Sequence, residues 1–289
     1  MKDVQVAMQN RWSLIPWIFG VGALSALALG FLDRAAAVST AGDVVGGLVV
    51  LELFTSQGCS SCPPADLLLS QIGSSAKGVI PLAYHVDYWN HLGWSDPFSS
   101  HEFSERQSAY TRAIDLGGEY TPQAVIEGSS QCVGSDGRSI WRAIDAARSS
   151  SDLGRVGLHA SLSGEGPRTL RIKVSAQSPK VSAAGGDRVM VAIFENGLVT
   201  KIGAGENAGR QITYDYTVRK LLPALDLDSA RSGSVEKQLT VDVDPSWSVD
   251  HLGVAAFIQD SQSLRILGAA SQYPVAKDQE ALSNGHGRT

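Results

Sequence analysis

The sequence predicts an α/β domain over residues 46–150, followed by an all-β, sandwich-like domain over residues 155–275. Three observations lead to this prediction. Patterns typical of buried strands and amphipathic helices alternate as far as about residue 150. A stretch rich in serine, residues 149–154, then reads as a linker. Beyond it the apolar residues alternate with a period of two, as in half-buried strands.

The N-terminal segment reads as an export signal. Residues 13–32 are almost wholly apolar, with Lys2 and Arg11 before them and three alanines, ending at Ala37, after them. About 20 apolar residues can also span a bilayer, so we expect either a signal peptide (residues 1–37) cleaved after Ala37 or an N-terminal anchor to the inner membrane. Both readings predict a periplasmic or secreted protein, in an oxidising compartment. The polar end, residues 276–289, is predicted to be disordered.

The charge composition of the chain argues against a nucleic-acid partner. The chain has 24 Lys and Arg against 29 Asp and Glu, a formal net charge of −5, and no basic stretch that could follow a phosphate backbone. We therefore expect no nucleic-acid partner. Three cysteines are too few for a scaffold held together by disulfides, so a CxxC motif in this exported chain is more typical of chemistry than of architecture.

Cys59 and Cys62 form that motif, between the apolar run 48–54 and a helix pattern over 65–72. Pro63 and Pro64 suit the first turn of a helix, where a missing N–H costs nothing. Free N–H groups and the helix dipole favour a thiolate at this position. We expect Cys59, as the more exposed cysteine, to attack and Cys62 to resolve.

Glu52 interrupts the apolar run and needs an explanation. In a strand it shares a face with Val50 and Phe54, so burial would raise its pKa and let it accept a proton from the second sulfur. The other reading is an edge strand with Glu52 in solvent. The sequence leaves both open.

A second strand is predicted over 79–86, followed by an aromatic loop, 87–94. A right-handed β-α-β crossover would make the two strands parallel and bring this loop beside the CxxC motif. His85 in the strand is expected to be structural, whereas His91 in the loop is a better active-site neighbour. Because thiolates and imidazoles suit Cu(I) or zinc, the two cysteines with His85 and His91 are an alternative metal site.

The remaining elements of the first domain follow from capping and proline signals. Ser99 and Glu102 form a capping box for a helix that stops before Gly117, and Ser135 is the expected cap of a helix over 136–148. Pro122 marks a strand boundary or a cis peptide. The strand after it should carry the chain roughly 20 Å from the active edge, so we expect Cys132 to be a free or buried thiol out of reach of Cys59.

The second domain is predicted from strand patterns alone, and these are typical of a β-sandwich. The runs are 156–162, 170–174, 188–194, 212–218, 239–243, 251–258 and 264–270.

Three stretches, LELFTSQGCSSCPPAD, YHVDYWNHLGWSDPFSSHEFSERQSAY and YTPQAVIEG, resemble a family of exported bacterial thioredoxin-like proteins, catalogued as domain of unknown function 1223. The resemblance implies a thioredoxin-like fold for the α/β domain. It implies that Thr121 and Pro122 face the dithiol, the proline in the cis form. It also implies that Glu52 is the counterpart of a buried acid, allowing one extra residue before Cys59. The family supplies no settled substrate.

These expectations combine into one functional hypothesis. We expect an enzyme, an extracytoplasmic thiol–disulfide oxidoreductase that exchanges with protein thiols or disulfides through Cys59 and Cys62. Thr121 and Pro122 would shape the substrate groove, Glu52 would handle a proton, and no cofactor beyond the redox-active disulfide is expected. The alternatives are a copper or zinc module and a non-catalytic interaction protein with a structural disulfide.

Overall fold

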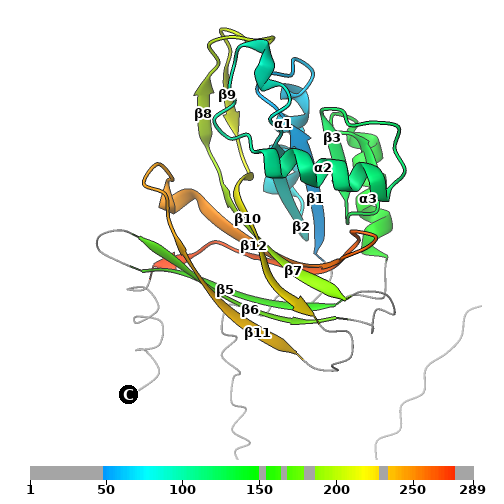
Figure 1. Ribbon diagram of the computed structural model, residues 1–289, viewed down its shortest axis with the longest axis vertical. Helices are drawn as coiled ribbons and strands as arrows, with labels where there is room; N and C mark the ends of the chain where they lie inside the picture. Colours follow the sequence, from blue (N-terminus) through cyan, green and yellow to red (C-terminus); the bar gives the residue numbers. More distant parts are fainter. Residues whose placement is uncertain (1–47, 150–153, 164–167, 179–185, 228–233, 277–289) are drawn as a thin grey trace, which may run out of the picture. The chain divides into compact units, whose positions relative to one another are not determined.

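The computed structural model describes residues 48–149, 154–163, 168–178, 186–227 and 234–276. These residues contain three α-helices and fourteen strands, and the strands form three sheets (Figure 1). The predicted signal or anchor over 1–37 lies outside the described residues, as does the predicted tail over 276–289 except for Ala276, which ends the last strand. No helix in the described part of the chain has the length and apolar character needed to cross a membrane.

The largest sheet has eight strands in the order β13-β12-β7-β10-β2-β1-β3-β4. β1 and β2 are parallel, as predicted, and β3 and β4 run antiparallel beside β1. The strands are β1 (Val49–Thr55), β2 (Val79–His85), β3 (Gln123–Ile126), β4 (Ser130–Val133), β7 (Asp187–Glu195), β10 (Thr217–Leu227), β12 (Leu252–Asp260) and β13 (Ile266–Gln272).

Helices cover both faces of the first half of this sheet. α1 (Pro63–Ser75) and α3 (Gly137–Arg148) pack with Leu51 and Leu53 on one face. α2 (His101–Ala113) packs with Val50 and Phe54 on the other face, because successive side chains of a strand point in opposite directions.

Two of the predicted helix caps are off by one residue. The hydroxyl of Ser100, not Ser99, accepts the N–H of Glu102 at the start of α2. Asp136, not Ser135, caps α3 by accepting the N–H of Ser139. In each case the side chain one position along is the one that reaches a free N–H group of the first turn.

A second sheet of four strands, in the order β11-β6-β5-β14, packs against the other half of the large sheet (Figure 1). Its strands are β5 (Arg155–Ser163), β6 (Thr169–Gln177), β11 (Val235–Asp242) and β14 (Val275–Ala276). Leu170, Ile172 and Val174 of β6 are fully buried against Val191 and Val254 of the large sheet. This apolar layer explains the two-residue alternation in the sequence.

The predicted fold class, an α/β thioredoxin-like domain followed by a β-sandwich domain, is wrong. The described residues are mostly strand, and strands from both halves of the chain belong to one mixed sheet of eight. β10 joins β2 in parallel at Thr217 and Ala83, and contacts join the described residues into one compact unit. The physical reason is that the N–H and C=O groups along the free edge of β2 need hydrogen-bond partners, which β10 supplies.

The strands β8 (Leu198–Lys201) and β9 (Gln211–Tyr214) form a two-stranded sheet of their own. Figure 1 shows this hairpin extending away from the large sheet, alongside the loop that follows β2. The indole of Trp94, in that loop, lies against Gly203 at the hairpin's end. The hairpin therefore reaches the same end of the molecule as the carboxyl ends of β1 and β2.

Candidate functional site

Cys59 and Cys62 are joined by a disulfide just beyond the end of β1, with their Cα atoms 5.4 Å apart. Cys62 is the N-cap of α1, and Pro63 follows at its first position, so the disulfide lies at the amino end of the helix dipole. Both cysteines are fully buried. The expectation that Cys59 is the more exposed one is therefore wrong.

A cis peptide bond between Thr121 and Pro122 lies beside the disulfide, which confirms one of the two predicted roles of the proline. The Sγ of Cys59 is 3.8 Å from the carbonyl oxygen of Thr121. The indole of Trp89 donates to the hydroxyl of Thr121 at 2.8 Å. The Trp89 backbone also lies against Gly58, so the aromatic loop is next to the CxxC motif, as predicted.

A buried polar cluster lies under the start of α1, made of Thr55, Asp66, His85 and Asp96. The Thr55 hydroxyl donates to Asp66 at 2.7 Å, and the Nδ1 of His85 is 2.7 Å from Asp96. Asp96 also accepts the backbone N–H of Gln57 at 2.8 Å, which connects the cluster to the turn that carries Cys59. All four side chains come from the carboxyl ends of β1 and β2 or from segments packed on them.

Burial and charge set the ionisation of this cluster. Burial raises the pKa of Asp66 to about 6, although nearby His85 and the Thr55 hydroxyl oppose the shift. Burial alone would lower the pKa of His85, but the Asp96 carboxylate outweighs it and raises that pKa. Burial opposes the ionisation of Asp96, yet His85 and two backbone N–H groups lower its pKa. Asp66 is therefore a carboxyl group whose pKa burial moves toward neutral pH.

Two atoms of the cluster have no hydrogen-bond partner in the described protein, the Oδ2 of Asp66 and the Nε2 of His85. Buried polar atoms are rarely left unpaired, so an unpaired one calls for a proton, a water molecule or a functional role. Asp66 follows Cys62 by four residues, and its N–H donates to the Cys62 carbonyl oxygen at 3.1 Å. Side chains four apart on a helix share a face and lean toward its amino end, so the Asp66 carboxyl extends back toward Cys62.

Glu52 is fully buried in a central strand, so the reading of an edge strand with Glu52 in solvent is wrong. Its carboxylate pairs with the Nε of Arg106 at 2.7 Å and accepts the hydroxyl of Tyr110. Both partners belong to α2, so Glu52 faces away from α1 and its disulfide. A role for Glu52 in proton transfer stays a prediction, and the structure places Asp66 on the side of the cysteines.

The two histidines of the metal alternative lie in different surroundings. His85 is fully buried against Asp96, whereas His91 has its Nδ1 2.7 Å from the carbonyl oxygen of Tyr88 in a short exposed helix over Asn90–Leu92. The described residues contain no group of three or more His, Cys, Asp or Glu side chains arranged to hold a metal ion. The metal alternative remains a prediction.

Cys132 is a free cysteine, as predicted. Its predicted place far from the active edge is wrong, because β4 folds back along β3 and pairs Cys132 with Ala124, two residues after Pro122. The thiol is half-buried against the core beside α3, and burial raises its pKa to about 11.

The sequence reading missed four residues that border the site: Asp66, Asp96, Glu206 and Asn207. For Asp66 a signal existed, because an acid falls next to Ala65 on the buried stripe of a short helix, four residues after Cys62. Asp96 lies in a loop where its partners were not predictable. Asn207 donates to the carbonyl oxygens of Gln57 and Cys59 across about 150 residues of sequence, and no local pattern indicates such a contact.

Together, the fold and the site define a class of protein. It is a mixed α and β protein with a CxxC disulfide at the start of a helix, beside a cis-proline and under a hairpin from a later part of the sequence. The chain belongs to the family described as "Protein of unknown function (DUF1223)", whose model matches residues 50–259. No curated protein matches the chain.

Two of the solved structures that are similar to it have a TM-score above 0.5. A crystal structure of an Agrobacterium tumefaciens protein is 29% identical, with a TM-score of 0.58, and the match covers 80% of this chain and 96% of that one. HBP35 of Porphyromonas gingivalis is 15% identical, with a TM-score of 0.61, over 79% of this chain and 75% of that one, and shows a likeness of fold alone.

Proposed function

We propose that the protein is an extracytoplasmic thiol–disulfide oxidoreductase. The observation that carries the proposal is the disulfide of Cys59 and Cys62 at the amino end of α1, with the cis peptide of Thr121 and Pro122 beside it. This arrangement also supports a relationship of the site, though not of the whole fold, to the thioredoxin-like superfamily. The apolar segment over 13–32 supports the location outside the cytoplasm.

The reaction is an exchange of sulfur partners. A thiolate of the substrate attacks the Sγ of Cys59, the bond to Cys62 breaks, and Cys62 leaves as a thiolate. A second substrate thiolate then attacks the substrate sulfur, which gives an oxidised substrate and a reduced CxxC pair. In the opposite direction the Cys59 thiolate attacks a substrate disulfide, and Cys62 resolves the mixed disulfide. Two electrons pass between substrate and protein in either direction.

Asp66 handles the proton of Cys62 in this proposal. When Cys62 resolves a mixed disulfide, its S–H proton passes to the Asp66 carboxylate; when Cys62 is released as a thiolate, the proton returns. Asp66 suits this role because one of its oxygens has no partner, because it shares a helix face with Cys62, and because its pKa is about 6. Asp96 and His85 hold the other side of the cluster in place.

The test is an exchange assay with single-cysteine variants of the full chain. Cys59→Ser and Cys62→Ser should both abolish turnover of a model protein disulfide, and Cys62→Ser should accumulate mixed disulfides that a second thiol releases. Cys132→Ser is the matched control and should keep wild-type turnover. Equal turnover by Cys59→Ser and the wild type would exclude the proposal.

The alternatives predict different outcomes. A structural disulfide predicts a reduction potential below about −300 mV and no trapped partner. A copper or zinc module predicts tight stoichiometric binding by the reduced protein, lost in Cys62→Ser. No specific contact in the described residues favours a structural disulfide or a metal module over thiol–disulfide exchange.

A further inference from the structure

The loop between β8 and β9, residues 202–210, lies on the CxxC turn and is called the covering loop here. Its Asn207 side chain is buried and donates to the carbonyl oxygens of Gln57 at 3.0 Å and Cys59 at 2.8 Å. The Glu206 carboxylate accepts the backbone N–H of Ser60 at 2.9 Å. Three backbone groups within four residues of the turn are therefore occupied by one distant loop.

The position of this loop conflicts with the chemistry of exchange. An attacking thiolate must reach a sulfur of the disulfide, yet Cys59 and Cys62 are both fully buried. In the structure as described, even a small thiol has no direct access. Some neighbouring element must move before the disulfide can react.

The covering loop is the neighbour whose strands lie outside the large sheet. Thr121 and Pro122 lead directly into β3 of the large sheet, and Trp89 is held by its bond to Thr121. By contrast, β8 and β9 pair with no strand of the large sheet and are held by side-chain contacts: the buried Tyr214 packs on His85, and the Thr200 hydroxyl accepts from Gln57 at 3.1 Å. Such contacts can change without disturbing the ladder of the large sheet. Most residues of the covering loop are exposed, with Ile202 and Asn207 as the buried exceptions.

We propose that the covering loop is a lid on the disulfide, held shut by Asn207 and Glu206, and that exchange requires it to open. The biological use of such a lid rests on the proposed function. The lid itself can be tested without any substrate, by measuring the chemical accessibility of the cysteines.

Glu206 adds an electrostatic effect to the steric one. The Glu206 carboxylate accepts the N–H of Ser60, the residue next to Cys59, so a negative charge lies beside the CxxC turn. Its negative charge disfavours a second negative charge on Cys59. Opening the lid therefore exposes the sulfur and makes its thiolate easier to form.

The experiment measures the alkylation of the reduced full-length protein by iodoacetamide, with each cysteine followed by mass spectrometry. Asn207→Asp keeps the size of the side chain but sets carboxylate oxygens against two carbonyl oxygens, so Cys59 should react roughly tenfold faster than in the wild type. Glu206→Gln should accelerate Cys59 roughly threefold. Glu236→Gln, at an exposed ion pair with Lys173 in the second sheet, is the matched control and should change nothing.

Cys132 is the internal reference, since it lies in β4, the edge strand of the large sheet that pairs with β3 and not with the hairpin of the covering loop. Faster alkylation of Cys59 with an unchanged rate at Cys132 supports the lid. If Asn207→Asp raises the alkylation rates of both Cys59 and Cys132, the substitution has loosened the whole fold. The test then depends on Glu206→Gln, which changes an exposed side chain. An unchanged Cys59 rate in Glu206→Gln then overturns the lid, as does an unchanged rate in both variants. A lid confirmed in this way in a protein without exchange activity would leave the lid standing and remove the proposed function.

Discussion

At the scale of single residues, two buried acids compete for the role of proton acceptor. Glu52 pairs with Arg106 on the α2 face of the sheet, whereas the cysteines lie at the start of α1 on the other face. Among the described residues, Asp66 has no cationic hydrogen-bond partner, and only one of its oxygens is hydrogen-bonded. The sequence favoured Glu52 because a strand pattern shows burial but does not show which helix covers each face.

We predict that Asp66 gives the exchange reaction a pH dependence near its pKa of about 6. Above this pH the carboxylate is ionised and accepts the proton of Cys62; below it the group is already protonated, so the resolving step slows as the pH falls. Asp66→Asn should slow this step on the order of a hundredfold at pH 7.5 and remove the inflection near pH 6. Single-turnover kinetics of mixed-disulfide resolution would measure both effects between pH 5 and 8, a range that includes the pKa of Asp66.

Glu52→Gln is the matched comparison for this prediction. If Asp66 is the acceptor, Glu52→Gln should keep the inflection near pH 6, whatever it does to stability. Loss of the inflection in Glu52→Gln and its survival in Asp66→Asn would return the role to Glu52, where the sequence first placed it.

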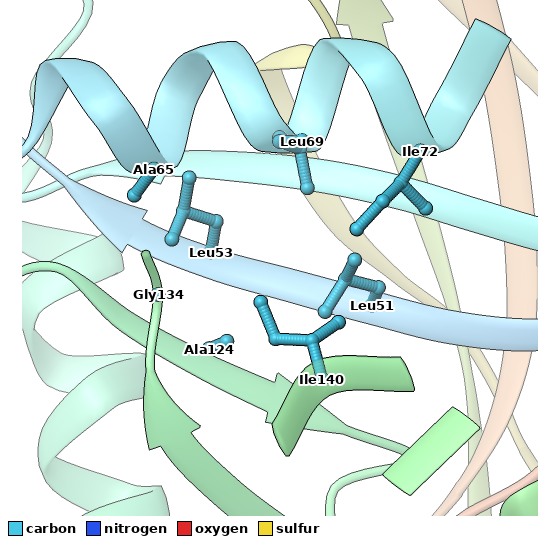
Figure 2. A pocket seen from close by; sticks show the side chains of 8 residues that line it. All are labelled: Leu51, Leu53, Ala65, Leu69, Ile72, Ala124, Gly134 and Ile140. Carbon is cyan, nitrogen blue, oxygen red and sulfur yellow. The ribbon is translucent and has the colours of Figure 1, made fainter. Parts of the chain in front are cut away.

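At the scale of elements, the site depends on how closely α1 approaches the loop that follows β4. Figure 2 shows Gly134 facing the side chains of Ala65 and Leu53, in a small apolar space between α1, β1 and α3. A Cβ added at Gly134 would lie 3.0 Å from the Cβ of Pro122 and 3.2 Å from that of Ala65. The N–H of Gly134 also donates to the Pro122 carbonyl oxygen at 2.8 Å. Gly134 thus sets the spacing between the cis-proline and the cysteine helix.

We predict that Gly134→Ala destabilises the protein by about 1–3 kcal/mol, because the new methyl group would lie 2.5 Å from the Cδ1 of Leu53 in a packed core. It should also lower the rate of exchange, since Pro122 or α1 has to shift. Chemical denaturation and the exchange assay measure the two effects. Gly117→Ala, where an added Cβ meets nothing within 4 Å, should leave both unchanged, and a similar loss there would refute the packing argument.

Local elements were predictable where one residue pattern determines them. The strand before Cys59, the helix after Pro63 and the cis form at Pro122 follow from apolar periodicity, from the position of prolines and from the family resemblance. The contact of Asn207 with Cys59 and the pairing of Thr217 with Ala83 did not follow. Period-two alternation shows that a strand has a buried face, but it does not show which strand lies at its edge.

At the scale of the whole molecule, a buried polar network joins the two halves of the chain. Arg106 of α2 pairs with Glu52 of β1 and donates to Gln259 of β12 at 3.2 Å, while Gln259 donates to the hydroxyl of Tyr110 at 2.8 Å. The Arg106 side chain is one-tenth exposed and Glu52 is not exposed at all. A network this well shielded from water makes each half depend on the other.

We predict that Arg106→Met lowers the free energy of unfolding by about 3–5 kcal/mol, because it leaves the Glu52 charge buried and unpaired. Adding Glu52→Gln to the same chain should restore part of the loss, since no unpaired charge then remains. Urea denaturation measures both. Arg188→Met is the control, because Arg188 and Asp226 form an exposed pair 2.8 Å apart that should contribute no more than about 1 kcal/mol.

The continuity of the large sheet leads to a prediction about the first half of the chain alone. Removing everything after residue 149 would strip β10 from the edge of β2 and expose the α2 side of the core, where Phe103 packs in one apolar cluster with Phe194 and Phe257. Residues 48–149 expressed alone should therefore show weak near-ultraviolet circular dichroism and no cooperative thermal transition, whereas a chain over 40–289 should unfold in one step. A cooperative transition in the short chain would mean that its α/β elements form an independent domain, as the sequence predicted, and that the shared sheet adds stability without being required for folding. The outcome decides whether the cysteine site can be assembled before the strands that cover it.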